Sequence, residues 1–124
     1  MLLEDFPERT IEVVDSLGAT GGMGLLVEAA IANKNAGMSL KENAEELRKR
    51  ARSVNYFIKV EDLMYLMRGG RVSATSAIMG TALSIKPILM VNGEGKLVTI
   101  DKKRGNKHAI KALIERFDNT YIKE

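Results

Sequence analysis

Cysteine and tryptophan are absent from the 124 residues of this sequence, and it contains a single histidine. Without cysteine there can be no disulfides, thiolate nucleophiles or cysteine-based metal sites, and this absence is typical of a reducing cytoplasm. No apolar run approaches the ~20 residues of a membrane span. Acids follow Met1 where a signal peptide would have basic residues. We therefore expect a cytoplasmic protein with no membrane insertion.

Aromatic residues are also scarce, at 5% of the chain. Hydrophobic residues make up 45% and charged residues 28%, which predicts a soluble globular fold with an aliphatic core. The net charge is only +3 and is not gathered into the concentrated basic stripe typical of nucleic-acid-binding proteins. We expect no nucleic-acid partner, and a weakly basic nucleic-acid-binding or regulatory module stays open as an alternative.

The first half of the sequence has the pattern of a βα unit. Residues 10–14 read as a short strand, residues 17–24 as a glycine-rich turn, and residues 25–35 as a helix that Gly37 can cap. This order predicts an α/β fold. A single strand cannot satisfy its own backbone groups, so this half resembles the end of an α/β domain whose earlier strands are absent.

The remaining pattern alternates helices with short strands. Ser39 and Glu42 form a capping box that opens a surface helix. A clear amphipathic helix closes the chain, with Ile110, Leu113, Ile114 and Phe117 at positions i, i+3, i+4 and i+7. Between them we expect a strand at 56–60, helices at 61–68 and 73–83, strands at 85–91 and 96–101, and a hairpin turn at 92–95.

The segment Arg68-Gly69-Gly70-Arg71 is the strongest candidate for a site. Its glycines allow the backbone to turn with positive φ and to approach a ligand. Arginine binds a carboxylate or phosphate with two parallel hydrogen bonds. Ser73 can cap the next helix, whose free N–H groups also favour an anion. A surface turn with two solvated arginines explains the same residues equally well.

Other segments carry weaker signals. The turn at residues 18–24 lacks the lysine of a phosphate loop and the third glycine of a dinucleotide motif. It serves either close helix–strand packing or the rim of a small-ligand site. The basic turn around Arg104 reads as a solvated turn or as a contact for an acidic partner, and His108 as an exposed helix residue. No catalytic triad or metal-ligand spacing occurs, so we expect no enzyme activity in this chain alone, no metal and no cofactor.

These segments, taken in order, resemble the DegV family. The resemblance runs from about residue 8 to 117, and its specificity comes from several motifs in register. The matching motifs are VVDS at 13–16, TGGMGLLV at 20–27, DLMYLMRGGRVS at 62–73, GTALSIKPIL at 80–89 and RGNKHA at 104–109.

The resemblance implies a two-domain α/β protein with a long-chain fatty acid in a tunnel between the domains. Such proteins, often called FakB, are binding subunits that present the fatty acid carboxylate to a separate kinase, which forms acyl phosphate. Arg71 matches the arginine of the carboxylate network, and Arg104 a basic position implicated in docking the kinase. Asp15, Ser16 and Thr20 match the turn that borders the ligand, and Gly70 belongs to the arginine turn.

The sequence also departs from this family. Family members are roughly twice as long, and the threonine, serine and histidine expected in the carboxylate network have no counterpart here. The resemblance therefore implies a truncated central portion, with residues 1–54 from the end of an N-terminal α/β domain and residues 55–124 from part of a mixed-sheet second domain. A structural fragment that forms a homo-oligomer through exposed strand edges is the remaining alternative.

Overall fold

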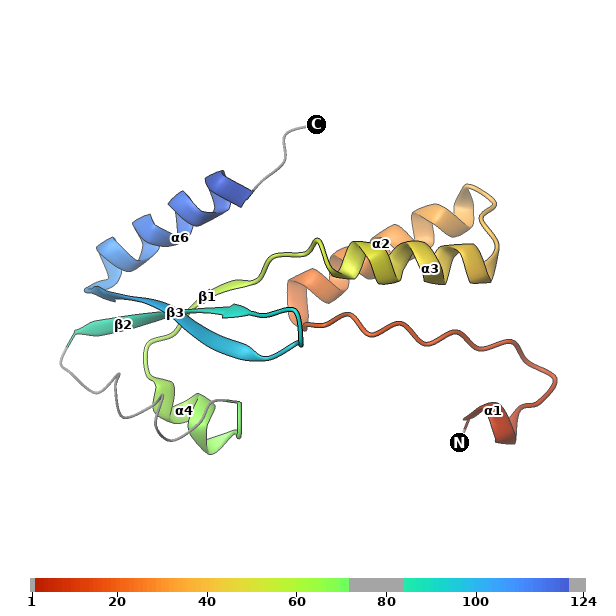
Figure 1. Cartoon of the computed structure of the whole chain (residues 1–124), viewed down its shortest axis with the longest axis horizontal. Helices are drawn as coiled ribbons and strands as arrows, with labels where there is room; N and C mark the ends of the chain where they lie inside the picture. The colour runs from red at the N-terminus through yellow and green to blue at the C-terminus, as the bar shows by residue number, and fades with distance from the viewer. Residues whose placement is uncertain (1, 72–83, 121–124) are drawn as a thin grey trace. The chain divides into compact units, whose positions relative to one another are not determined.

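The computed structural model describes residues 2–71 and 84–120, and the helix expected at 73–83 lies outside them (Figure 1). The chain divides into two compact units, Met1–Val54 and Asn55–Glu124. That these units are parts of the two family domains stays a prediction. Each unit is described by itself below.

Unit 1 contains three helices and no strand among its described residues. The helices are α1 (Leu2–Asp5), α2 (Thr20–Asn35) and α3 (Leu40–Ala51). The strand expected at 10–14 was wrong, because residues 10–15 have no regular secondary structure and Val13 is 74% exposed. A strand needs a neighbour to pair its backbone, and the described part of this unit offers none.

Helix α2 begins five residues before the expected position, so its glycines at 21, 22 and 24 lie in helical turns rather than in a loop. Each glycine weakens a helix by only about 1 kcal/mol relative to alanine, so a long helix tolerates them. The other end is as predicted. Gly37 has φ +85°, its N–H donates to the carbonyl of Lys34 (3.0 Å), and the N–H of Met38 donates to that of Asn33 (3.0 Å). This is a Schellman ending.

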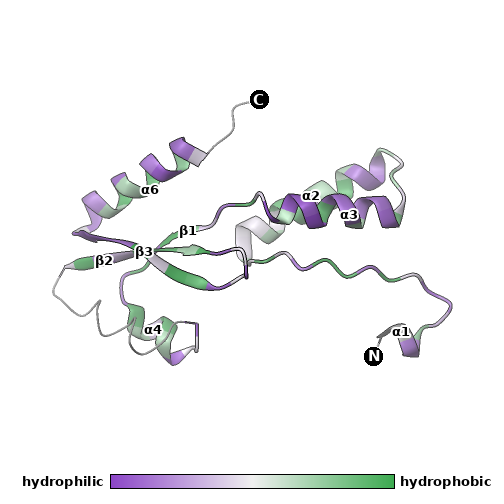
Figure 2. Cartoon of the chain, in the orientation of Figure 1, coloured by the Kyte–Doolittle hydropathy of each residue, from purple (hydrophilic) through white to green (hydrophobic). Residues whose placement is uncertain are grey.

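The predicted capping box opens α3. The Glu42 N–H donates to Ser39 Oγ (3.3 Å) and the Ser39 N–H to Glu42 Oε2 (3.1 Å). The helix then packs on α2 through a small core of Leu26, Ala29, Leu47 and Ala51. The other side of α2 stays in solvent, where Met23, Val27 and Ile31 lie four residues apart and are exposed. Figure 2 shows how little of α2 is strongly hydrophilic.

Unit 2 is built on an antiparallel sheet with the strand order β1-β2-β3. The strands are β1 (Phe57–Lys59), β2 (Ile85–Val91) and β3 (Leu97–Arg104). Strand β2 lies where the sequence predicts it, β1 is one residue shorter at each end, and β3 begins one residue later and ends three residues later than expected. No parallel pair occurs among the described strands. The predicted hairpin turn joins β2 to β3, with Gly95 at φ +75°.

Helices cover both faces of this sheet. Helix α6 (Asn106–Thr120) lies on one face, where Lys59 donates a hydrogen bond to Asn106 and Arg116 pairs with Asp101 (Figure 1). Helix α4 (Leu63–Arg68) lies on the other, where Leu63 packs with Leu89. Ile58, Met64, Met67 and Leu97 pack around this second core. Successive residues of β1 thus point alternately to α6 and to α4.

The apolar stripe of α6 is not its buried face. Ala109 and Ala112 are buried, whereas Ile110 is 49%, Ile114 55% and Phe117 56% exposed. Ala109 and Ala112 let the helix lie close to the sheet, and Arg116 pairs with Asp101 of β3. Spacing therefore predicted the helix correctly, but it did not show which side meets the sheet.

Candidate functional site

The arginine turn is held by the end of α4. Asp62 caps the start of this helix by accepting a hydrogen bond from the Met64 N–H (2.8 Å). At the other end the N–H of Gly70 donates to the carbonyl of Met67 (2.9 Å), and that of Arg71 to the carbonyl of Leu66 (2.8 Å). These two bonds form a Schellman ending. Gly70 occupies its left-handed position with φ +70°.

The backbone of Arg71 is thus fixed, and its side chain extends from a defined point. One guanidinium nitrogen donates to the carbonyl of Gly69, and the guanidinium carbon of Arg68 lies 6.0 Å from the centre of the Tyr65 ring. No carboxylate of the described residues pairs with Arg68 or Arg71. Both cations also suit a helix C-terminus electrostatically, so a purely structural role and an anion site remain compatible with this geometry. Ser73, the expected second half of the anion site, lies outside the described residues.

The turn before α2 holds three other candidates. Asp15 Oδ1 accepts a hydrogen bond from the Leu17 N–H (2.8 Å), and Ser16 Oγ donates to the carbonyl of Gly18 (2.9 Å). Leu17 and Thr20 both have φ +53°, which is uncommon for residues other than glycine. Such backbone strain gathers at ligand-binding sites. The structure therefore joins Asp15, Ser16 and Thr20 in one strained turn of unit 1, and Gly70 and Arg71 in one turn of unit 2.

Arg104 ends β3 at the corner before α6. The next residue, Gly105, has φ +79° and donates its N–H to the carbonyl of Ser84 (2.7 Å). His108 Nδ1 lies 3.0 Å from the carbonyl oxygen of Arg104. Arg104 is exposed, and no ion pair joins it to a carboxylate in the described part of the chain. The corner therefore presents a cation to solvent. This fits both a solvated turn and a contact for an acidic partner.

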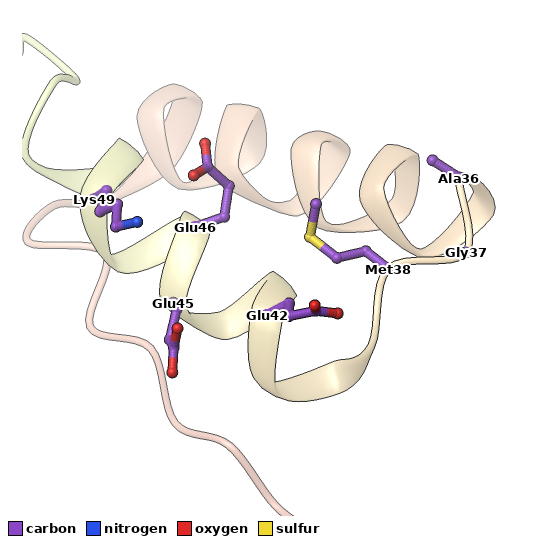
Figure 3. A pocket seen from close by; sticks show the side chains of 7 residues that line it. All are labelled: Ala36, Gly37, Met38, Glu42, Glu45, Glu46 and Lys49. Carbon is purple, nitrogen blue, oxygen red and sulfur yellow. The ribbon is translucent and has the colours of Figure 1, made fainter.

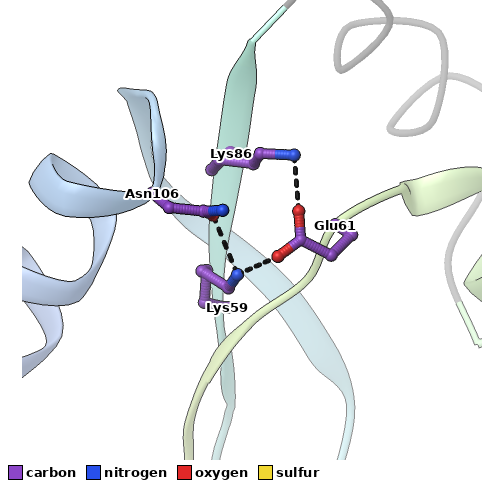
Figure 4. A network of polar contacts seen from close by, with 4 residues as sticks. All are labelled: Lys59, Glu61, Lys86 and Asn106. Atoms are coloured by element: carbon purple, nitrogen blue, oxygen red, sulfur yellow. Dashed lines mark hydrogen bonds and ion pairs between the residues drawn. The ribbon is translucent and has the colours of Figure 1, made fainter.

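Glu61 forms a polar network that sequence reasoning missed. Its carboxylate pairs with Lys59 of β1 and, at 2.5 Å, with Lys86 of β2, while Lys59 also donates to Asn106 Oδ1 at 3.0 Å (Figure 4). The two lysines hold the pKa of Glu61 well below its usual range, at about 2. In the sequence, Glu61 is only the first residue of the helix expected at 61–68, because Lys86 becomes its neighbour only once β1 and β2 are paired.

A pocket of about 430 Å³ lies at the corner between α2 and α3 (Figure 3). Glu42, Glu45 and Glu46 line it with Lys49 and three residues of the loop. Two of these carboxylates have partners, since Glu42 accepts from Ser39 and Glu46 pairs with Arg50. No group of acids and histidines in residues 2–71 and 84–120 is arranged to hold a metal ion. Nor does any described helix have the length and apolarity needed to cross a bilayer.

The structure is that of an α/β protein in which helices cover both faces of a sheet. Arg71 lies in the turn after α4, and Arg104 lies at the corner after β3. The family described as "Uncharacterised protein, DegV family" matches residues 1–124, and the chain belongs to this family. A DegV domain-containing protein of Streptococcus pyogenes is 40% identical over 118 residues, which are 95% of this chain and 41% of that protein. Another from Lactococcus lactis is 42% identical over 116 residues, which are 94% of this chain and 40% of that protein.

Solved structures agree with the family and the fold. A fatty acid binding DegV family protein from Streptococcus agalactiae is 37% identical, with a TM-score of 0.85 over 96% of this chain and 42% of that one. The Fatty Acid Kinase (Fak) B3 protein of Streptococcus pneumoniae, loaded with linoleic acid, is 27% identical, with a TM-score of 0.85 over 94% of this chain and 42% of that one. The α/β fold is thus confirmed, and the chain spans less than half the length of these relatives.

Proposed function

We propose that this chain supplies the arginine side of a fatty-acid-binding site, with Arg71 as the residue that binds the carboxylate. The Schellman ending of α4 fixes the backbone of Arg71, and its guanidinium, which donates to the Gly69 carbonyl, has no carboxylate partner among the described residues. A carboxylate can therefore bind it through two charge-assisted hydrogen bonds. This observation carries the proposal, and the fatty-acid-binding relatives support the class of ligand.

The surroundings of the turn suit a ligand with an anionic head and an apolar tail. Helix α4 ends at Arg68, whereas its residues Leu63, Met64 and Met67 pack over the sheet. Methionine side chains adapt easily to an apolar guest, and each buried methylene contributes about 0.8 kcal/mol. In the same proposal Gly70 lets the backbone turn toward the carboxylate, and Asp15, Ser16 and Thr20 border the ligand.

The proposed role is binding and presentation rather than catalysis. A separate kinase would phosphorylate the bound carboxylate, and Arg104 would contact that partner, since it extends from a rigid strand–helix corner. The threonine and the serine that the family resemblance implies beside Arg71 have no counterpart in this sequence. We therefore expect the 124-residue chain alone to bind fatty acid weakly or not at all.

The test uses a chimera, in which residues 8–117 replace the matching segment of the Streptococcus agalactiae relative. Native mass spectrometry should find co-purified fatty acid, and titration with oleate should show tight binding. Arg71→Ala should weaken binding roughly ten-fold or more, since a charged hydrogen-bond partner is lost. Arg52→Ala, at an exposed position of unit 1, is the matched control. A folded chimera without fatty acid, or one in which Arg71→Ala behaves as the control does, would contradict the proposal.

A further inference from the structure

We infer that Glu61 is a positioning residue for Arg71, acting through the ion pairs that it makes at the start of α4. The inference rests on the proposed function, in which Arg71 binds the carboxylate of the ligand. Residues 60–84 connect β1 to β2, and they carry α4 and the arginine turn. The Val60 N–H donates to the carbonyl of Pro87 (3.4 Å), and Glu61 is the next residue along this connection. Glu61 therefore lies where the chain leaves the sheet.

Two lysines of the sheet bind the Glu61 carboxylate, which lies between their ammonium groups (Figure 4). Lys59 is the last residue of β1, and Lys86 is the second residue of β2, the central strand. Their side chains are only 19% and 20% exposed, so neighbouring atoms restrict their motion. Lys59 also donates to Asn106 Oδ1 at 3.0 Å. The carboxylate is thus bound at two points of a paired sheet, although it is itself exposed.

Helix α4 connects this anchor to Arg71. The helix has six residues and a length of about 9 Å, and Arg71 follows it in a turn of fixed backbone geometry. Leu63 packs on Leu89, but apolar packing is not directional and restrains the tilt of a short helix only weakly. A tilt of about 10° would displace the far end of α4 by about 1.5 Å, whereas a binding group has to be held within about 0.5 Å. The ion pairs of Glu61 at the near end oppose such a tilt.

The expected consequence is specific to the carboxylate of the ligand. In the proposed function Arg71 contacts only the anionic head, so a displaced Arg71 should weaken the binding of a fatty acid. It should not weaken the binding of the fatty alcohol with the same tail, which has no carboxylate. A general loss of stability in unit 2 would weaken both ligands. A comparison of oleate with oleyl alcohol therefore separates a positioning role from a purely structural one.

The test titrates the chimera described above with each of these two ligands. Glu61→Gln should raise the dissociation constant for oleate about five-fold and leave that for oleyl alcohol unchanged. In the Arg71→Ala background the same substitution should have no further effect, because the group that Glu61 positions is gone. Glu94→Gln is the matched control, since it removes an exposed ion pair with Lys96 in the same unit. Far-UV circular dichroism confirms that each variant is folded.

Two further variants test the inference even if Glu61→Gln folds poorly. Lys86→Met removes one partner of the carboxylate and should also weaken the binding of oleate only. Glu61→Lys combined with Lys86→Glu exchanges the two charges and should restore most of the oleate affinity that Glu61→Lys loses. The inference is overturned if folded Glu61→Gln binds oleate as the control does, if both ligands are weakened equally, or if its effect adds to that of Arg71→Ala.

The failure of this inference and the failure of the proposed function give different results. If oleate binding to the chimera does not depend on Arg71, the proposed function is wrong, and the role of Glu61 with it. If Arg71→Ala weakens oleate binding and neither Glu61→Gln nor Lys86→Met does, the proposed function stands and only the positioning role of Glu61 is wrong.

Discussion

Lys59 Nζ lies 3.0 Å from Asn106 Oδ1, so the edge strand of unit 2 is tied to the first residue of α6. The same ammonium pairs with Glu61, which also reaches Lys86 on the central strand. One exposed carboxylate therefore links two strands and, through Lys59, the helix that covers them.

Glu61→Gln should lower the melting temperature of unit 2 at neutral pH. The folded pKa of Glu61 is about 2, below the ordinary value of 4.5, so its stabilising effect is complete above 4.5 and is lost as the pH falls toward 2. The difference between wild type and Glu61→Gln should shrink across this window in thermal unfolding followed by circular dichroism. Glu45→Gln, an exposed acid of α3, is the control. A difference that does not change with pH would contradict the role given to these ion pairs.

Two glycine substitutions should have opposite signs. Gly70→Ala places a side chain at φ +70° and should cost about 1–2 kcal/mol, because the left-handed region is strained for alanine. Gly24→Ala lies inside α2 with open space around the new methyl group, and it should add about 1 kcal/mol. Urea unfolding of each variant measures both. Equal signs would show that the turn after α4 differs from the one described.

Ser39→Ala should destabilise α3 by about 1 kcal/mol, because the capping box loses its side-chain acceptor. The measurement is the urea midpoint of unit 1 with its far-UV helical signal. Ser53→Ala, at an exposed position after the same helix, should have little effect. Comparable losses in both variants would show that the cap is not a specific contributor.

Leu89→Ala should cost about 2–5 kcal/mol, since Leu89 is fully buried on the α4 face of the sheet. Leu40→Ala removes the same atoms from a position that is 51% exposed, and its cost should be far smaller. Denaturant titration of the two variants gives the comparison. A small cost at Leu89 would mean that this core is loosely packed.

Local signals predicted local structure well. The capping box at Ser39, the Schellman glycine at Gly37 and the hairpin after β2 each depend on residues a few positions apart, and the structure confirms all three. The prediction of a strand at 10–14 was wrong because a strand depends on residues far away in the sequence. A strand exists only with a partner, and partners are set by contacts that one segment does not encode.

In the candidate site, too, features set by neighbouring residues were predictable, and features set by distant contacts were not. The glycine-dependent turn that carries Arg71 was predictable from Arg68 to Arg71 alone, because positive φ at Gly70 is a local requirement. The Glu61 network was not, because Lys86 becomes its neighbour only through the pairing of β1 with β2. Nor could the rotation of α6 be predicted, since Ala109 and Ala112 are buried while the larger apolar side chains of the helix are half exposed.

The exposed side of α2 has a practical consequence in the laboratory. Met23, Val27 and Ile31 add to the apolar surface of α6, and a net charge of +3 supplies little mutual repulsion between molecules. Ammonium sulfate strengthens contacts between such surfaces. We expect the protein to be retained on hydrophobic-interaction resin and to precipitate early in a salt fractionation. Its colloidal behaviour would thus be governed by two helix faces rather than by the stability of its cores.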